Sequence, residues 1–206
     1  MTNSAPTAAA AEFHSAVKGR RAIREYADQP IAADVLDRVV DAALEAPSAF
    51  NLQLRDVVVV RDAETKNKLT ETSGQPQFAA ADTVLIFVAR TEAIPEDASE
   101  ILPESYLERV AGMKADLPAD VLREMAMKDA MLAAGFGLMA AAMEGLATSP
   151  TTGWNEETVK ELIGLGGRED RGIALVVAMG HPTEAAADAA HPGRQASRRV
   201  NERYSA

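Results

Sequence analysis

The chain has 206 residues, enough for one domain with a substantial core or for one protomer of an intimate oligomer. Its formal net charge of −10 argues against nucleic acid or an anionic membrane as the main partner. The absence of cysteine excludes disulfides and thiolate chemistry, and three histidines without ligand spacing argue against a metal site. A soluble cytoplasmic protein is therefore expected.

The first part of the chain combines a polar start with a cluster of arginines. Residues 1–11 lack the basic and apolar parts of a signal peptide, and we expect a disordered tail before a domain over 12–206. A short helix over Glu12–Lys18 should end near Gly19. Three arginines follow within five residues of an otherwise acidic chain: Arg20, Arg21 and Arg24. Because a guanidinium group matches a phosphate, this density indicates a bound phosphate, and a solvated charged turn is the alternative.

A polar loop separates the next helix from the first strand. Apolar residues at helical spacing predict a helix over Ala33–Glu45, which Pro47 should end. The β-branched run Val57–Val60 predicts a buried strand. Three uncharged hydrogen-bonding side chains lie between them: Ser48, Asn51 and Gln53. Such a loop can present donors and acceptors to a flat polar heterocycle without adding charge, and an ordinary turn is the alternative.

The middle of the chain predicts a second strand, an excursion and a long apolar helix. Thr83–Ala89 is the apolar strand. Residues 91–119 contain prolines, glycines and many charges, and are expected to form a lid-like excursion with a helix over Glu104–Lys114. Pro118 suits the start of a helix running to about Leu146. The second half of this helix is apolar on all faces, which predicts a central or subunit-interface helix that is buried all round.

The last part of the chain predicts a turn, a helix, a strand and a polar extension. Thr148–Trp154 is expected to be a polar turn, after which Asn155 can cap a helix. Ile173–Met179 is another apolar strand, and Gly180 ends it. Residues 181–206 form a polar C-terminal extension that is expected to wrap over a surface. The sequence contains neither a phosphate-binding glycine loop nor a serine-hydrolase motif.

Several of these stretches resemble, in order, the FMN-dependent nitroreductase family of NAD(P)H oxidoreductases. The family's opening Arg-Arg-Ser-x-Arg pattern, followed by an aromatic residue, is similar to Arg20–Tyr26. Its Ala-Pro-Ser-x-x-Asn-x-Gln-Pro pattern is similar to Ala46–Leu54, with leucine in place of the last proline. Gly74–Pro76, the turn at Pro150–Trp154 and a strand ending in Gly180–Pro182 are also similar. The resemblance implies an α+β fold with a mixed central β-sheet flanked by helices, in an intertwined homodimer.

The resemblance runs from about residue 16 to residue 204, and it implies a site shared between two protomers. The segment expected to hold the phosphate and ribityl chain of a tightly bound FMN contains Arg20, Arg21, Ala22 and Arg24, with Arg194 as a further phosphate ligand. The residues expected from the other protomer are Pro47, Ser48 and Asn51. Gln75 would approach the edge of the flavin ring. The residues expected near ring atom N5 are Pro150, Thr151, Thr152 and Gly153, with the Thr152 backbone N–H donating to N5.

The implied activity is transfer of hydride from NAD(P)H, through flavin N5, to a nitroaromatic, quinone or other conjugated acceptor by a ping-pong mechanism. Three departures from the family pattern bear on the substrate more than on the cofactor. Ala22 replaces a hydroxyl often used on the phosphate, Leu54 and Arg55 replace a common Pro-Trp pair, and Thr152 replaces a glutamate found in several members. The alternatives are a reductive dehalogenase, a flavin-consuming enzyme, a non-catalytic flavin-binding protein, and an interaction module whose arginines are solvated.

Overall fold

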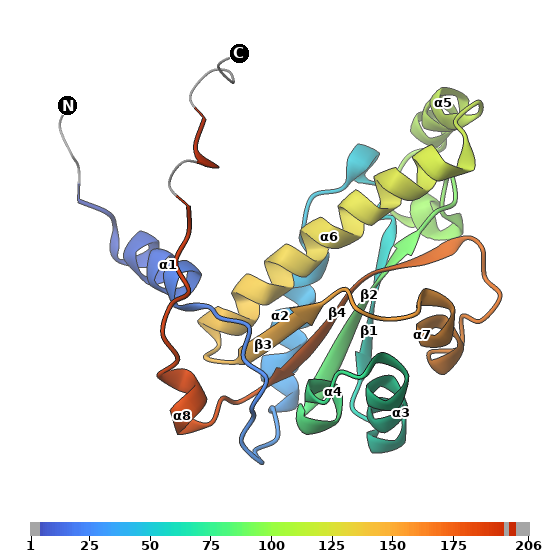
Figure 1. The fold of residues 1–206 in the computed structure, drawn as a ribbon. Coiled ribbons are helices and arrows are strands. Elements are labelled where there is room, and N and C mark those ends of the chain that lie inside the picture. The colour runs from blue at the N-terminus through green and yellow to red at the C-terminus, as the bar shows by residue number, and fades with distance from the viewer. Residues whose placement is uncertain (1–4, 196–197, 201–206) are drawn as a thin grey trace.

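A four-stranded sheet covered by helices on both faces forms the centre of the computed structural model, which describes residues 5–195 and 198–200 (Figure 1). The strands are β1 (Arg55–Val60), β2 (Thr83–Arg90), β3 (Ala147–Thr151) and β4 (Arg171–Gly180), in the spatial order β1-β2-β4-β3. All three pairs of neighbouring strands are antiparallel, and the parallel pairing among the described residues is one isolated bridge between Ala22 and Thr148. The expected α+β architecture of a central sheet flanked by helices is confirmed.

Helices pack on the sheet in two groups. One face is covered by α2 (Ala33–Leu44) and α6 (Ala119–Met143), and the other by α3 (Ala63–Ser73), α4 (Gln77–Ala80) and α7 (Glu156–Leu162). Outside these layers lie α1 (Ala8–Gly19), α5 (Glu104–Lys114), α8 (Glu184–Ala187) and two short 3-10 helices, η1 (Ala49–Asn51) and η2 (Glu96–Glu100). Figure 1 shows α1 and α8 at one end of the molecule and α5 at the opposite end.

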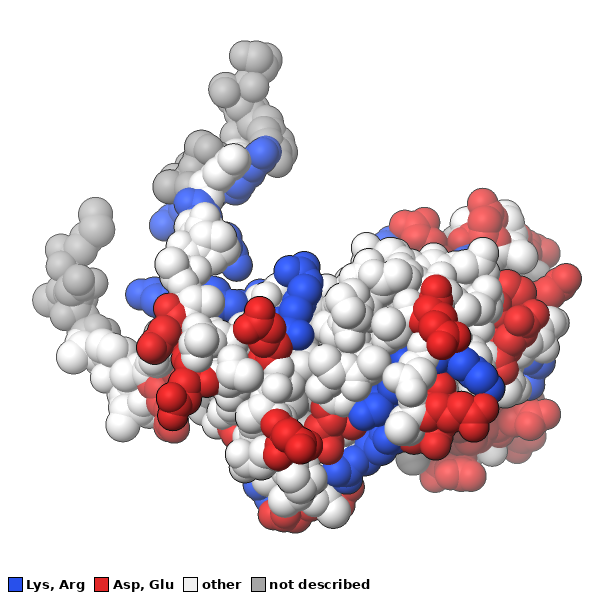
Figure 2. All heavy atoms as spheres, turned by 60° about the horizontal axis from the view of Figure 1, so that its bottom comes forward, with Lys and Arg blue, Asp and Glu red and all other residues white. Residues whose placement is uncertain are grey.

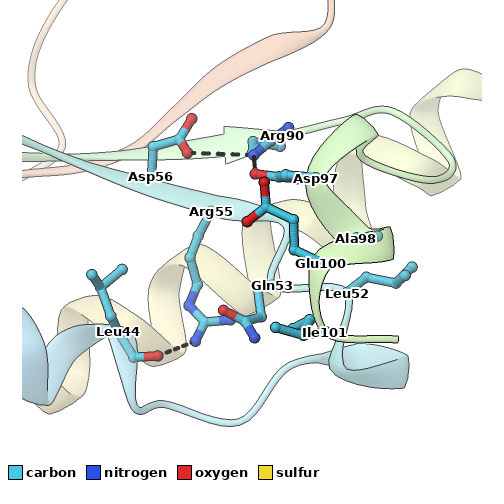
Figure 3. Close-up of a pocket in the computed structure, with 10 residues that line it drawn as sticks. All are labelled: Leu44, Leu52, Gln53, Arg55, Asp56, Arg90, Asp97, Ala98, Glu100 and Ile101. Atoms are coloured by element: carbon cyan, nitrogen blue, oxygen red, sulfur yellow. Dashed lines mark hydrogen bonds and ion pairs between the residues drawn. The ribbon is translucent and has the colours of Figure 1, made fainter. Parts of the chain in front are cut away.

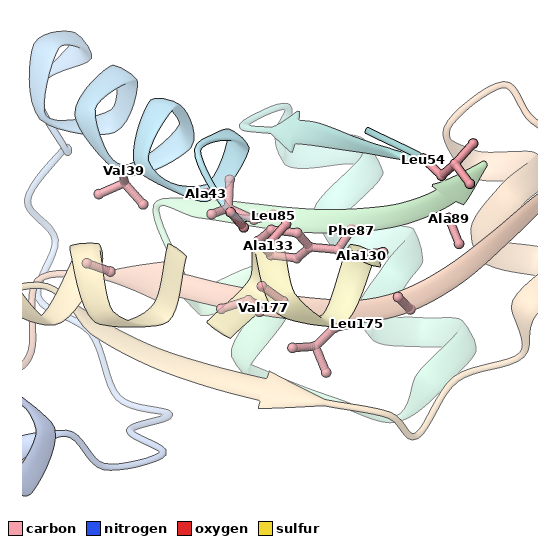
Figure 4. Close-up of a cluster of buried hydrophobic side chains, with 14 of the residues drawn as sticks. Val39, Ala43, Leu54, Leu85, Phe87, Ala89, Ala130, Ala133, Leu175 and Val177 are labelled. Carbon is pink, nitrogen blue, oxygen red and sulfur yellow. The ribbon is translucent and has the colours of Figure 1, made fainter. Parts of the chain in front are cut away.

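The two central strands bury side chains on both faces of the sheet, which explains why their sequences are continuously apolar. In β2, Leu85 and Phe87 belong to the core between the sheet and α2 and α6. Val84 and Ile86 alternate with them and belong to the second core, against α3, α4 and α7. Figure 4 shows the first core, where side chains of α2, α6 and the central strands point toward one another.

Two predictions fail at the edges of the sheet. β1 is an edge strand, and Val59 is 40% exposed, so the prediction of a buried strand over Val57–Val60 is wrong for its middle. β3 occupies the other edge, and the first four residues of the predicted polar turn pair with β4 as part of this strand. Pro150 of β3 lies opposite Val177 of β4. Proline has no backbone N–H to donate to a second neighbouring strand, so it is tolerated in an edge strand such as β3.

The long helix α6 was predicted to be buried all round, and this is wrong for the protomer. Its inner face approaches its neighbours closely, since a Cβ atom on Gly137 would lie 3.3 Å from the Ala43 Cβ and from the Phe87 Cζ. Its outer face exposes four large apolar side chains by 44–46%: Met131, Leu132, Phe136 and Met143. Among the described helices, α6 alone is long and apolar enough to cross a membrane, yet it packs on α2, β2 and β4 as a core helix.

The ends of the chain differ from the predicted boundaries. α1 begins at Ala8, four residues before the predicted start, because the Thr7 Oγ1 accepts a hydrogen bond from the Ala10 N–H over 3.3 Å. The predicted tail therefore contributes to a helix, and its residues 1–4 lie outside the described residues. Parts of the predicted C-terminal extension, 196–197 and 201–206, also lie outside them. The domain division itself stays a prediction.

Phe87 is 1% exposed and fills the space between the sheet and α6. We expect Phe87→Ala to lower the free energy of unfolding by about 3–5 kcal/mol, because it removes buried apolar surface and leaves a cavity. Urea denaturation measures this loss. Val59→Ala on the partly exposed edge strand is the control, and should cost about 1 kcal/mol or less. Equal losses in the two variants would contradict the position of Phe87 in the core.

Candidate functional site

The arginine segment and the C-terminal extension meet beside β3. Backbone pairing fixes this arrangement, because the Ile23 N–H donates to the Thr148 carbonyl over 3.0 Å. Arg20 and Arg21 line a cavity of about 200 Å³, together with residues of α1, the end of α6, β3 and α8. Burial lowers the pKa of the Arg20 guanidinium, and the nearby charges of Arg194 and Arg21 lower it further. Three of the predicted phosphate ligands therefore lie close together.

These arginines have no acidic partner in the part of the chain that the structure describes. The four arginines concerned are Arg20, Arg21, Arg24 and Arg194. Several other arginines do have acidic partners: Arg38 binds Glu144 over 2.8 Å, and Arg90 binds Asp97 over 2.8 Å. Figure 2 shows Lys and Arg side chains gathered along the C-terminal segment and at its base, whereas Asp and Glu dominate the opposite end. An anion thus meets positive charge without having to displace a carboxylate.

Buried polar atoms without partners point to the same cavity. Arg20 Nη1, Arg21 Nε and Thr148 Oγ1 are all buried, and none has a hydrogen-bond partner within the described residues. Arg21 Nη1, in contrast, donates to carbonyls at the end of α1, including Lys18 O over 2.6 Å. Buried donors without acceptors are costly, and a phosphate group offers several acceptor oxygens at once. The residues present therefore fit the phosphate of an FMN.

Arg24 and Ala22 lie beside the next hollow along the surface. They line it together with Ala185, Ala186 and other residues near α8. Both are exposed, and Arg24 does not line the cavity of Arg20 and Arg21. Ala22 carries no hydroxyl, so this position offers a phosphate only its backbone. The structure thus divides the predicted arginine cluster between two neighbouring hollows.

Gln75 and the predicted ring-binding segment come together at the other end of β3. Pro150 and Thr151 are the last residues of this strand, and Thr152 and Gly153 follow as exposed residues. A Cβ atom on Gly153 would lie 3.4 Å from the Gln75 Nε2, so the nitrogen of this side-chain amide faces the segment. Gln75, the 150–153 segment and the arginine cavity are therefore arranged along one edge of the sheet.

The Asn51 loop has an unusual backbone. Phe50, Asn51 and Gln53 have φ angles of 58°, 54° and 53°, a left-handed conformation that residues other than glycine seldom adopt. Pro47 ends α2 as predicted, since this helix stops at Leu44. Strain of this kind persists only where surrounding contacts hold it, and it often marks functional segments.

Side chains hold this loop against α6. Ser48 Oγ accepts from the Gln53 N–H over 3.0 Å, and Asp129 Oδ1 accepts from the Ala49 N–H over 3.1 Å. Burial raises the pKa of Asp129, while the bond from Ala49 opposes this shift. Ala142 lines the arginine cavity about 20 Å further along α6, at a rise of 1.5 Å per residue. The structure therefore does not bring Pro47, Ser48 and Asn51 to the arginines within one protomer.

A cavity of about 190 Å³ lies between the Asn51 loop and the 91–119 excursion (Figure 3). Its wall includes Arg55, which stands where the family commonly has tryptophan. The buried Arg55 side chain donates through Nη2 to Ala46 O over 2.7 Å and to Leu44 O, at the C-terminal end of α2. A cation at a helix C-terminus is favourable. Arg55 therefore supports the base of the loop, and burial lowers its pKa.

Several contributors were missed by the sequence analysis. Asp129 had one available signal, a carboxylate in the apolar stretch of a helix, and it was not used. His191 lies near the arginines, and its pKa is lowered by burial and by the charges of Arg21 and Arg194. Gln77 donates through Nε2 to Gln75 Oε1 over 2.8 Å, and no pattern in the sequence indicates this bond.

Comparison with known proteins gives consistent matches along most of the chain. Residues 17–181 match the Nitroreductase family. An NADH dehydrogenase of Thermus thermophilus is 32% identical over 174 residues, which cover 80% of this chain and 84% of that protein. An FMN reductase (NAD(P)H) of Bacillus subtilis is 34% identical over 140 residues, which cover 68% of this chain and 53% of that protein. The chain thus spans about half the length of the second relative.

The fold also matches a solved structure. The NADPH:FMN oxidoreductase of Vibrio harveyi, complexed with NAD⁺, superposes with a TM-score of 0.74 at 24% sequence identity. This match covers 95% of the present chain and 79% of the Vibrio harveyi chain. The extent of the family match and the identity to the Thermus thermophilus protein lead to one conclusion: the chain belongs to the nitroreductase family.

Proposed function

We propose that the chain is a cytoplasmic, homodimeric FMN-dependent oxidoreductase that takes hydride from NAD(P)H and delivers it to a nitroaromatic, quinone or other conjugated acceptor. The observation that carries this proposal is the set of arginines without acidic partners, in a protein of net charge −10. A phosphate would supply the acceptors that Arg20 Nη1 and Arg21 Nε lack. FMN supplies the redox chemistry when bound, so the chain needs only to bind it, orient it and shape the electrostatics around it.

The other end of the proposed site suits a flat heterocycle. Thr152 lies about 13 Å along the chain from Thr148, at about 3.3 Å per strand residue. A molecule with a phosphate at one end and a ring at the other would reach both. The Thr152 backbone N–H and Gln75 Nε2 would donate to the ring, Thr152 toward N5. A main-chain donor is fixed by the fold, so it costs little reorganisation when charge shifts on the ligand.

The acceptor and the order of reaction complete the proposal. NAD(P)H and the acceptor would use the same surface in turn, which is a ping-pong order. Initial rates with NADH or NADPH, a nitroaromatic and a quinone should give parallel lines in double-reciprocal plots. Recovery of intact FMN after many turnovers would separate this activity from a flavin-consuming enzyme. A protein that binds FMN but oxidises neither dinucleotide would instead be a flavin-binding protein without catalysis.

Binding of FMN through its phosphate predicts a difference between FMN and riboflavin, which lacks the phosphate. Arg20→Met should weaken FMN by tenfold or more, because a hydrogen bond to a charged group contributes about 1.5–3 kcal/mol. Arg24→Ala should weaken FMN to a similar extent if its guanidinium also reaches the ligand. Both variants should leave riboflavin affinity nearly unchanged. Fluorescence titration of the apo-protein measures both ligands.

Arg38→Met is the matched control for this titration. Arg38 is an arginine that already binds Asp34 and Glu144, so its loss should leave FMN affinity unchanged. Equal affinity of the wild-type protein for FMN and riboflavin would show that the phosphate is not recognised by these arginines.

A second protomer is part of the proposal because the Asn51 loop and the arginines lie far apart in one chain. Their contacts with α6, at Asp129 and Ala142, are about 20 Å apart along the helix. If one FMN contacts both, the loop must come from the partner. The outer face of α6 suits such a partner, since apolar side chains such as Phe136 are partly exposed there.

Gly135 adds an independent argument for close contact on this face. It lies in the middle of α6, and a Cβ atom there would meet nothing within 4 Å in the protomer. Glycine costs a helix interior about 1 kcal/mol relative to alanine. A glycine on an open helix surface is therefore unfavourable for the protomer alone, and useful where another backbone approaches.

Complementation between two defective chains tests the shared site. An Arg20→Met chain and an Asn51→Ala chain should each form weakly active homodimers. In their mixed dimer one site carries both defects and the other carries neither, so activity should recover to about half of wild type. Co-expression with two different purification tags isolates the mixed dimer. Activity that stays at the level of the two parents would mean that both residues serve the same protomer's site.

Gly135→Met tests the contact itself, and Gly112→Met is its matched control. Gly112 is also an open glycine within a helix, α5, away from the outer face of α6. Sedimentation should show weaker association for Gly135→Met only. A wild-type monomer that binds FMN would contradict the dimer.

A further inference from the structure

A buried glutamine lies directly behind Gln75. Gln77 is the first residue of α4 and is 2% exposed. Its Nε2 donates to Gln75 Oε1 over 2.8 Å, while its own Oε1 is buried without a hydrogen-bond partner. An apolar side chain of similar size would fill the same space without burying an unpaired carbonyl. Packing alone therefore does not account for this residue.

The bond between the two glutamines determines which end of the Gln75 amide faces outward. Because Gln75 Oε1 accepts from Gln77, the Gln75 Nε2 is directed toward Gly153, at 3.4 Å from the position of a Cβ there. This Nε2 has no acceptor within the described residues. The amide thus offers an N–H donor, and not a carbonyl, to whatever lies beside the 150–153 segment.

We propose that Gln77 is a positioning residue, which holds Gln75 in the orientation that donates to an acceptor atom on the edge of the bound ring. This inference rests on the proposed function, since the ring is that of FMN. A donor at this edge favours the more electron-rich state of the ring, whereas a carbonyl would oppose it. Gln77 therefore acts on the reduction potential through Gln75, without touching the ligand.

Gln77→Met tests this role, because methionine has a similar volume and no amide. With the orientation of Gln75 no longer fixed, the bound FMN should lose about three- to tenfold of its preference for the reduced state, as expected for one ordinary hydrogen bond. The midpoint potential of bound FMN measures this ratio, and the visible spectrum reports the change at the ring. Gln75→Leu should produce at least the same shift.

A double-mutant cycle distinguishes positioning from general support of the fold. If Gln77 acts through Gln75, then adding Gln77→Met to Gln75→Leu should cause no further shift in potential. Additive shifts would overturn the proposal. Gln29→Met, which changes an exposed glutamine that lies near the end of α4 but has no hydrogen bond to Gln75, is the matched control and should leave the potential unchanged.

The apo-protein gives a readout that needs no cofactor. In side-chain amide NMR spectra, the Gln77 NH₂ protons should exchange slowly with solvent and the Gln75 NH₂ protons quickly, and Gln77→Met should move the Gln75 resonances. Rapid exchange at Gln77 would overturn the proposal even if FMN binds. Wild-type protein that shows the protected amide but binds no FMN would refute the proposed function, and with it the assigned role, while leaving the hydrogen bond intact.

Discussion

Guanidinium groups held together without counter-charges are the constraint on which the candidate site depends. The folded chain brings Arg20, Arg21 and Arg194 close enough for their charges to repel, and it partly buries Arg20 as well. A carboxylate among them would relieve this repulsion, but it would also compete with an incoming phosphate. Asp and Glu are most abundant at the opposite end of the molecule, and those near the arginines form no ion pair with them among the described residues. An anion that binds only the folded state therefore also stabilises that state.

The edge strand β3 organises the site around this charge. Its first half pairs with the arginine segment through Ala22 and Ile23, and its last residues lead into Thr152 and Gly153. An edge strand can do this because one side of its backbone is free of the sheet. The second edge strand, β1, follows the Asn51 loop. The buried Arg55 side chain donates to the Ala46 carbonyl at the start of this loop. Both segments of the candidate site are thus placed where the sheet ends.

Burial could be predicted from the sequence wherever neighbouring chain segments cover both faces of an element. β2 and β4 were predicted from continuous apolar runs, and α2 from apolar residues at helical spacing, because these patterns report the local environment directly. The exposure of the sheet edges and of the outer face of α6 was not predicted, because the apolar character of a segment does not show which neighbouring element covers it. The arginines were visible as a basic cluster in an acidic chain, and the resemblance of motifs then suggested their individual roles. The hydrogen bonds that Ala49 N–H donates to Asp129 and that Gln77 donates to Gln75 depend on the three-dimensional arrangement, so no spacing in the sequence could indicate them.

The helix α6 has a mechanical consequence that follows from its length. It is a rod of 25 residues, about 37 Å long, with the Asp129 contact to the strained loop in its middle and one wall of the arginine cavity at its end. At Gly137 the helix packs closely against Phe87, since a Cβ atom added there would lie only 3.3 Å from the Phe87 Cζ. A displacement of the helix along its axis therefore moves the loop and the cavity wall together.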